Sequence, residues 1–202
     1  KPSVMMNRRS LLTGAAALAV TAAARPALAI PAVDPPPPSA PIPGLTLAPE
    51  LYPTVVTVRH DLEPGSIHVL SDRHYLYYIA RKGVAIRYGV AVGKAELVFR
   101  GAAEVGKKVE WPSWKPTPEM IARNPGAYAK YADGMPGGPK NPLGARAIYL
   151  FQDGRDTAIR IHGTIEPNSI GKSVSNGCLR MVNEHVIDLY DRVALGAPVM
   201  VY

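Results

Sequence analysis

The sequence predicts a mostly β domain with short helices and one long, lid-like insertion between strands. Segments rich in β-branched and aromatic residues recur along residues 54–202, and turns with Gly or Pro separate them. Residues 111–144 break this pattern with many Pro, Gly, Trp and Tyr residues. An irregular segment of this length more often serves a functional site than packing. The composition, 47% hydrophobic and 19% charged over 202 residues, is that of a globular protein.

Residues 1–29 have the three parts of a secretory signal. Arg8 and Arg9 supply the basic start, and residues 11–24 form an apolar stretch that is short for a membrane span. An Ala-Leu-Ala site at residues 27–29 predicts cleavage. The arginine pair followed by Ser-Leu-Leu resembles a twin-arginine signal, with the Sec route as the alternative. We therefore expect export to the periplasm or cell envelope, with no transmembrane span after cleavage.

Residues 30–53 contain nine prolines, which favour an extended polyproline II spacer over a packed structure. The predicted domain then occupies residues 54–202. Four basic residues and no acidic ones lie before residue 30, which leaves 19 basic and 16 acidic residues and a net charge of +3 in the predicted mature chain. So small a charge gives no reason to expect a nucleic-acid partner.

The predicted strands are short and separated by turns, and Lys82-Gly83 is a hairpin turn candidate. These strands are residues 54–58, 66–70, 74–80, 84–92, 145–151, 157–162 and 198–202. A short helix is predicted over residues 118–123, with Thr117 as its N-cap. A second is predicted over residues 184–193, with Asn183 as its N-cap and Gly196 ending it.

Cys178 is the only cysteine in the chain, so in an exported protein it has no disulfide partner within its own chain. The chain has five histidines, and His162 is the one that ends a predicted strand, directly before Gly163. A thiol with a pKa of about 8.5 is mostly protonated at neutral pH, and a nearby imidazole can take its proton. The sequence therefore predicts a thiol nucleophile at Cys178 with His162 as its base.

The residues around Cys178 suit this chemistry. Gly177 removes a side chain beside the sulfur and leaves backbone N–H groups to face a developing oxyanion. Arg180 lies two positions further on, so in an extended segment it points to the same side as the sulfur and suits a substrate carboxylate. The alternatives are a structural buried cysteine, a structural histidine and a solvated arginine. We expect no metal site, because one sulfur without C-x-x-C or H-x-x-x-H spacing is a poor zinc site.

The stretch IHGTIEPNSIGKSVSNGCLRM resembles the signature of the L,D-transpeptidase catalytic domain, the YkuD-like family. The family pairs an H-G-T turn with a downstream S-[HN]-G-C-x-R motif, and an N-P-L-G like that of residues 141–144 precedes the histidine strand. The matching residues are His162, Gly163, Thr164, Ser175, Gly177, Cys178 and Arg180. Asn176 stands where many members have histidine, which puts in doubt only a secondary orienting role.

The resemblance implies a YkuD-like β-sandwich with its site under a mobile lid. It implies that Cys178 attacks the carbonyl between the third residue of a peptidoglycan stem and the terminal D-Ala, with His162 as general base. The amides of Gly177 and Cys178 are the candidate oxyanion hole, and Ser175 orients the site. The residues expected to bind the substrate or line its groove are Arg180, Gly163, Thr164, Asn176, Trp111, Trp114 and Tyr131. No cofactor or metal is required, and a monomer is the expected state.

Several functions share this signature. An amine from a second stem would give a 3→3 cross-link, an amine on an outer-membrane protein would give an anchored protein, and water would give carboxypeptidation. An L,D-endopeptidase that cleaves existing cross-links is a further alternative within the family. Outside it, the alternatives are a non-catalytic peptidoglycan-binding domain and a cysteine protease of another fold.

Overall fold

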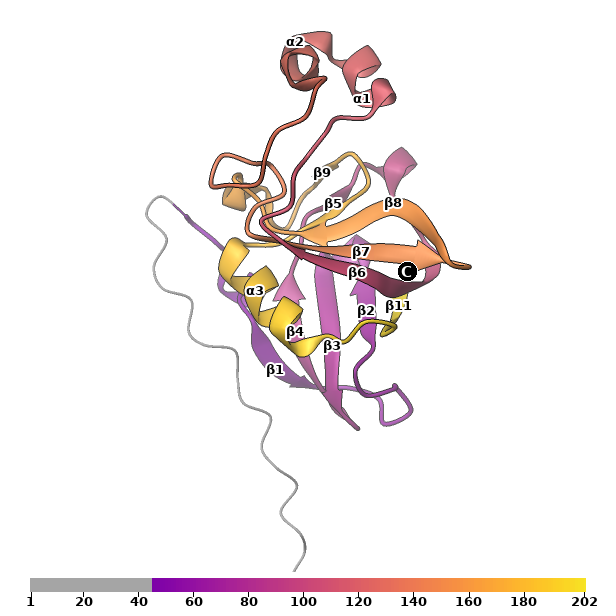
Figure 1. Ribbon diagram of the computed structural model, residues 1–202. Helices are drawn as coiled ribbons and strands as arrows, with labels where there is room; N and C mark the ends of the chain where they lie inside the picture. The colour runs from indigo at the N-terminus through magenta and orange to yellow at the C-terminus, as the bar shows by residue number, and fades with distance from the viewer. Residues whose placement is uncertain (1–44) are drawn as a thin grey trace, which may run out of the picture. The chain divides into compact units, whose positions relative to one another are not determined.

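The computed structural model describes residues 45–202 of the chain (Figure 1). The predicted signal at residues 1–29, and residues 30–44 of the predicted spacer, lie outside the described residues. Along residues 45–202, no helix combines the length and the apolar character that crossing a membrane requires.

A nine-stranded sheet dominates the domain, with the strand order β1-β4-β3-β2-β11-β6-β7-β8-β10. A second, two-stranded sheet pairs β5 with β9. The strands are β1 (Thr54–Thr57), β2 (Ile67–Leu70), β3 (Tyr75–Arg81), β4 (Val84–Gly89), β5 (Val92–Gly93), β6 (Gly101–Glu110), β7 (Arg146–Gln152), β8 (Arg155–His162), β9 (Ser173–Ser175), β10 (Leu179–Arg180) and β11 (Pro198–Val201). The mostly β prediction is therefore confirmed.

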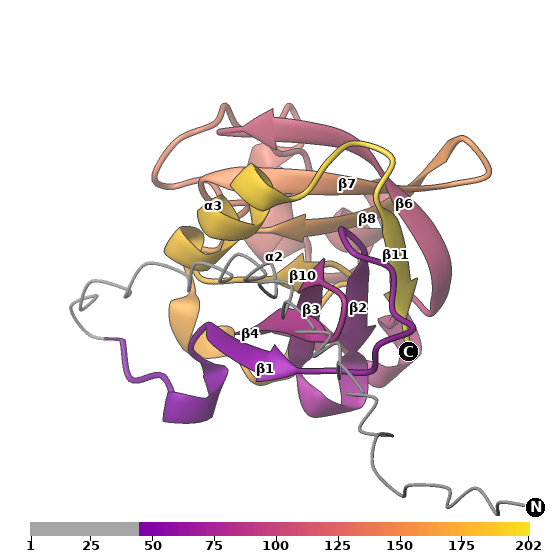
Figure 2. The same cartoon turned by 90° about the horizontal axis from the view of Figure 1, so that it is seen from below.

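The large sheet is strongly curved. Figure 1 shows β6, β7 and β8 running across the direction of β2, β3 and β4, and Figure 2 shows β11 beside β2. The curvature lets the two halves enclose a single large apolar core, which draws side chains from both, such as Ile67 and Leu76 from one half and Ile148 and Ile161 from the other. Burial of these side chains is the main favourable contribution to the stability of the fold.

The longest helix, α3 (Asn183–Arg192), packs against β7 and β8 through its buried Val186 and Leu189. The sequence predicted this helix over residues 184–193, so its position is confirmed, but its N-cap and its C-terminal end differ from the prediction. Val182 is the N-cap, because the Asn183 side chain instead accepts from the Ala145 N–H at 3.0 Å and donates to the Thr164 carbonyl at 3.2 Å. At the other end α3 stops at Arg192, before Gly196.

Strand β6 is the largest element that the sequence did not predict. Its sequence, GAAEVGKKVE, has only two β-branched residues and an irregular burial pattern with a single buried residue. It forms because β7 and β11 hydrogen-bond to its two edges. The predicted strand over residues 84–92 also divides into β4 and β5, with Val90 and Ala91 between them.

The insertion between β6 and β7 carries α1 (Pro118–Arg123), α2 (Pro125–Tyr128) and the short 3₁₀-helix Ala129–Tyr131. Figure 1 shows these helices standing away from the sheet. The predicted N-cap of α1 is confirmed, since Thr117 Oγ1 accepts from the Met120 N–H at 3.2 Å. The insertion thus forms a small helical unit on two connecting segments.

Residues 45–53, which the proline content assigned to the spacer, contain the 3₁₀-helix Pro49–Leu51 and contact the domain. Leu47 is buried with Ala91, Ile170 and Val182, and Leu51 packs against the same cluster. A Cβ on Gly89 would lie 2.7 Å from the Leu51 carbonyl oxygen, so this contact is close. The apolar side chains of this short segment, and not its prolines, explain why it packs.

The packing of Leu47 predicts a measurable stability effect. Leu47 is 8% exposed, so Leu47→Ala should lower the free energy of unfolding by about 2 kcal/mol through lost burial and an unfilled cavity. The measurement is urea denaturation followed by circular dichroism. Leu195→Ala is the control, because Leu195 is 64% exposed. Equal midpoints for the two variants would contradict the contact.

Candidate active site

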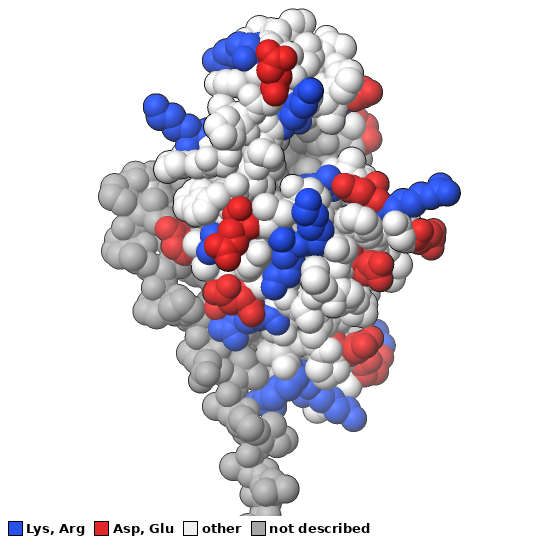
Figure 3. Space-filling model, in the orientation of Figure 1, with Lys and Arg blue, Asp and Glu red and all other residues white. Residues whose placement is uncertain are grey.

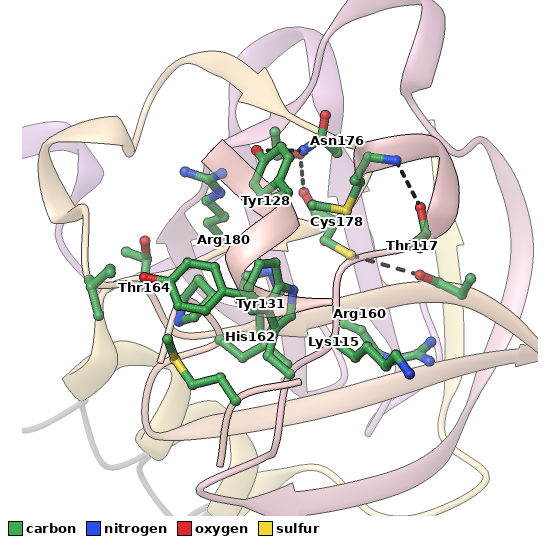
Figure 4. A pocket seen from close by; sticks show the side chains of 18 of the residues that line it. Lys115, Thr117, Tyr128, Tyr131, Arg160, His162, Thr164, Asn176, Cys178 and Arg180 are labelled. Atoms are coloured by element: carbon green, nitrogen blue, oxygen red, sulfur yellow. Dashed lines mark hydrogen bonds between the residues drawn. The ribbon is translucent and has the colours of Figure 1, made fainter. Parts of the chain in front are cut away.

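A cavity of about 590 Å³ lies between the sheet and the helical insertion (Figure 4). Its wall includes Cys178 and His162 from the sheet side and Tyr128 from the insertion. Eight of the residues expected at the site line it: Trp114, Tyr131, His162, Thr164, Ser175, Asn176, Cys178 and Arg180. The fold therefore brings most of the predicted set together.

Pairing of β10 with β8 creates this arrangement. The two strands are parallel, with Leu179 opposite Ile161 and Arg180 opposite His162. Cys178 directly precedes β10, so the register places it beside the end of β8 that carries His162. His162 and Cys178 are separated by fifteen residues in the sequence, and the pairing of β8 with β10 brings the two ends of this segment together.

His162 ends β8 and is 4% exposed. Its Nδ1 lies 2.6 Å from the Gly163 carbonyl oxygen. A carbonyl only accepts, so Nδ1 carries the proton and the neutral ring presents Nε2 as an acceptor. Burial lowers the pKa of His162 to about 4, opposed by the hydrogen bond to Gly163. The imidazole is therefore neutral at pH 7 and able to take a proton.

Cys178 is half-buried, and its Sγ donates to the Ala158 carbonyl at 3.8 Å. Burial raises the pKa of the Cys178 thiol, while the main-chain N–H of Arg160 and the charges of Arg160 and Arg180 act in the opposite direction. The resting group is thus a thiol, which needs a base before it can act as a nucleophile.

Ser175 fixes the turn that carries the cysteine. Its Oγ donates to the Cys178 carbonyl at 2.5 Å and accepts from the Gly177 N–H at 3.2 Å. Gly177 has φ +120°, and a Cβ there would lie 3.0 Å from the Leu97 carbonyl oxygen. Glycine is thus required for backbone geometry, and its amide is already engaged by Ser175 rather than turned toward a ligand.

Arg180 forms an ion pair with Glu166 at 2.7 Å, and Thr164 Oγ1 accepts from the Glu166 N–H at 3.0 Å. These contacts join β10 to the turn after His162, so Arg180 braces that turn. Gly163 lets the Asn183 side chain lie close to the main chain of this turn, because a Cβ on residue 163 would lie 2.1 Å from Asn183 Oδ1.

Asn176 links the cysteine turn to the insertion. Its Nδ2 donates to Tyr128 Oη at 3.4 Å, and its Oδ1 accepts from Arg123 at 3.3 Å. Trp114 packs edge-on against Tyr131, with ring centroids 5.8 Å apart. Trp111 does not share this place: it is 48% exposed and lies outside the cavity wall.

Other residues at the site were not predicted from the sequence. Arg160 lies two positions before His162 on β8, and strand alternation was the signal that could have found it. Tyr128 and Arg123 carried no such signal, because their approach to Asn176 depends on how the insertion folds. Ala158 was also not predicted, because no sequence pattern indicates which main-chain carbonyl will contact the cysteine sulfur.

Basic side chains outnumber acidic ones on the cavity wall, with Glu166 as its one acidic residue among those described. The basic residues are Lys115, Arg123, Lys140, Arg160 and Arg180. Elsewhere on the face seen in Figure 3, basic and acidic side chains are interspersed. Among residues 45–202 no group of three or more His, Cys, Asp or Glu side chains is arranged to hold a metal ion.

Comparison with known proteins gives one family. Residues 64–201 match the family model described as the L,D-transpeptidase catalytic domain. A putative L,D-transpeptidase of Fuscovulum blasticum is 39% identical over 52% of this chain and 51% of its own length. The putative L,D-transpeptidase YqjB of Bacillus subtilis is 36% identical over 68% of this chain and 72% of its own length. The chain thus spans about half the length of the first of these relatives.

A solved structure from Brucella melitensis is 52% identical, with a TM-score of 0.54 over 75% of this chain and 93% of that one. That protein is described as a probable carnitine operon oxidoreductase. The description concerns the other protein, and the likeness between the two chains is one of sequence and fold.

The buried imidazole predicts a pH-dependent stability. The folded state holds His162 neutral down to about pH 4, whereas the unfolded chain takes up the proton near about pH 6.5. The free energy of unfolding should therefore fall as the pH drops from 6.5 to 4, by on the order of 2 kcal/mol for this group. Urea denaturation at several pH values measures the slope.

His162→Gln should flatten that slope, whereas Cys178→Ala, which keeps the imidazole, should retain it. The slope would not vanish, because burial also lowers the pKa of His185 to about 4. An identical slope in wild type and His162→Gln would contradict the assignment.

Proposed function

Because the chain belongs to the L,D-transpeptidase catalytic domain family, we propose that it is a peptidoglycan transpeptidase that works through an acyl-enzyme on Cys178. One observation carries the proposal: Cys178 and His162 line one cavity, with the imidazole Nδ1 hydrogen-bonded to Gly163 so that Nε2 is the acceptor. A neutral imidazole with an acceptor nitrogen in the same cavity as the thiol supports the pairing of a nucleophile with a general base.

In the first half-reaction, His162 Nε2 takes the thiol proton and Sγ attacks the carbonyl between the third stem residue and the terminal D-Ala. The tetrahedral oxyanion is bound by the amide of Cys178, because the Gly177 amide donates to Ser175. The imidazolium then gives its proton to the leaving amine, D-Ala departs and a thioester remains. Burial of the imidazole favours this return of the proton.

In the second half-reaction, the neutral imidazole takes a proton from an acceptor amine as the amine attacks the thioester carbonyl. The C–S bond then breaks, and the imidazolium returns the proton to the departing thiolate, which restores the Cys178 thiol and the neutral His162. The product is an amide when the acceptor is a second stem, which gives a 3→3 cross-link, or an outer-membrane protein. Water as the acceptor gives the L,D-carboxypeptidase reaction instead. In each half-reaction His162 acts first as general base and then as general acid, and these roles need no metal and no cofactor.

The charge of the cavity wall supports an anionic peptide as substrate. Stem peptides carry free carboxylates, and Lys115, Lys140 and Arg123 present positive charge at the cavity. Arg180 is committed to Glu166, so its part is to hold the turn after His162. Trp114, Tyr128 and Tyr131 supply an aromatic wall on the insertion side.

The predicted export signal is the basis for placing the activity in the periplasm or cell envelope. The non-catalytic alternative, a peptidoglycan-binding domain, has less support because it gives no reason for a neutral imidazole beside a lone thiol in a cavity. The L,D-carboxypeptidase and L,D-endopeptidase alternatives use the same site and differ only in acceptor and substrate.

Intact mass spectrometry of residues 30–202 with a disaccharide-tetrapeptide tests the proposal. The wild type should lose D-Ala from the donor, form a covalent adduct and release a dimer, whereas Cys178→Ala should do none of these. The ratio of dimer to tripeptide separates transpeptidase from carboxypeptidase. An untouched muropeptide with both proteins would refute the substrate assignment.

A further inference from the structure

Strand β8 contains an irregularity directly beside the cysteine. Tyr149 of β7 pairs with Arg160, and Phe151 pairs with Asp156, so three residues of β8 lie opposite the single Leu150. Within them Ala158 has φ +63°, the left-handed region that side chains with a Cβ rarely adopt. Strain of this kind persists only where the surroundings enforce it.

Side chains on either side of Ala158 enforce the bulge. Asp156 Oδ1 accepts from the Ala158 N–H at 2.8 Å, and both Asp156 oxygens accept from the Arg160 guanidinium, at 2.6 and 2.8 Å. Thr157 Oγ1 donates to the Leu150 carbonyl at 2.7 Å and accepts from the Ile159 N–H at 3.1 Å. The bulge is therefore held by its own side chains.

Stacking fixes the far end of the same segment. The Arg160 guanidinium lies over the Tyr149 ring, 4.0 Å from its centroid. The guanidinium is thus held by the ring and by Asp156, and its side chain is only 17% exposed. The Arg160 guanidinium therefore has its partners within the bulge and on β7, just as the Arg180 guanidinium is paired with Glu166.

The bulge presents two main-chain groups to the Cys178 sulfur. The Ala158 carbonyl accepts from Sγ at 3.8 Å, and the main-chain N–H of Arg160, two residues later, lowers the pKa of the same thiol. Even in a regular strand, the carbonyl of one residue and the N–H of the residue two positions later face the same edge, which for Ala158 and Arg160 is the edge of β8 that pairs with β10. The bulge around Ala158 adjusts the direction of these groups on that edge.

We propose that residues 156–160 form a sulfur cradle, in which Asp156 and Thr157 are positioning residues that hold the Ala158 carbonyl and the Arg160 N–H against Cys178 Sγ. The inference rests on the proposed role of Cys178 as nucleophile. The carbonyl suits the resting thiol, which can donate a hydrogen bond. Once His162 has taken the proton, the thiolate can only accept, so the carbonyl repels it and the Arg160 N–H binds it.

Alkylation of the full chain by iodoacetamide tests the cradle, with the rate followed by mass spectrometry between pH 5 and 10. Cys178 is the only cysteine, so the label reports on this sulfur alone. The charged groups that face it are Asp156, Arg160, Arg180 and His162. Two variants of one residue, Asp156→Asn and Asp156→Ala, remove the same charge, but only asparagine keeps an oxygen to accept from the Ala158 N–H.

The midpoint of the alkylation profile should lie higher for Asp156→Ala than for Asp156→Asn, by about half a pH unit or more, because only alanine releases the Arg160 N–H from the sulfur. Thr157→Val, an isosteric change that keeps Asp156, should also raise the midpoint above that of the wild type. Asp153→Asn, on the turn of the same hairpin, is the control and should leave the profile unchanged.

Transpeptidation gives a second readout. Thr157→Val and Asp156→Ala should lower kcat roughly tenfold while the donor KM changes less than about twofold, since positioning acts on the chemical step. Circular dichroism checks folding, and if Asp156→Ala fails to fold, Thr157→Val against the wild type decides.

Equal alkylation midpoints for Asp156→Ala and Asp156→Asn, together with a wild-type profile for Thr157→Val, would overturn the cradle. The expected midpoints with a wild type that leaves muropeptides untouched would support the cradle and refute the proposed function. The two inferences therefore fail separately.

Discussion

Two residues of parallel pairing hold the site together. Strand β10 is only Leu179–Arg180, yet its register against β8 fixes where the segment around Cys178 meets the end of the strand that carries His162. Two ladder pairs are a weak constraint by themselves. The surrounding contacts make them specific: the Arg180–Glu166 ion pair, the bridge between Ala91 and Arg180, and the Met181 N–H that donates to the His162 carbonyl.

The turn after His162 is supported from behind by the start of α3. Asn183 accepts from the Ala145 N–H and donates to the Thr164 carbonyl, so one amide joins the residue before β7, the turn and the helix. Gly144 and Gly163 are glycines for this reason, since a Cβ on either would lie within 2.2 Å of Asn183 Oδ1. The Gly163 carbonyl that orients His162 is thereby placed by a side chain that lies outside the cavity.

Residue types and spacing singled out Cys178 and His162, and the fold brings both to one cavity. A lone cysteine after glycine and a histidine at a strand end are visible in the sequence, whereas the backbone geometry around them is not. Strand β6 could not be predicted in this way, because its Gly, Ala, Glu and Lys residues become a strand only through the neighbours on both edges. The role of Asn183 was misread as an N-cap, since an asparagine before a helix has several possible partners and only the fold decides among them. No sequence pattern indicated the left-handed conformation of Ala158 or the contact of its carbonyl with the Cys178 sulfur.

The position of β11 in the sheet has a consequence for folding. The strand order places β1 to β4 on one side of it and β6, β7, β8 and β10 on the other, and within the large sheet the two groups are joined only through β11. Pairing of Val199 with Ile67 and with Ala103 links segments that are far apart in sequence. The apolar core draws side chains from both halves and from β11, so the core is complete only when these distant segments have paired, and topologies with such non-local contacts fold slowly.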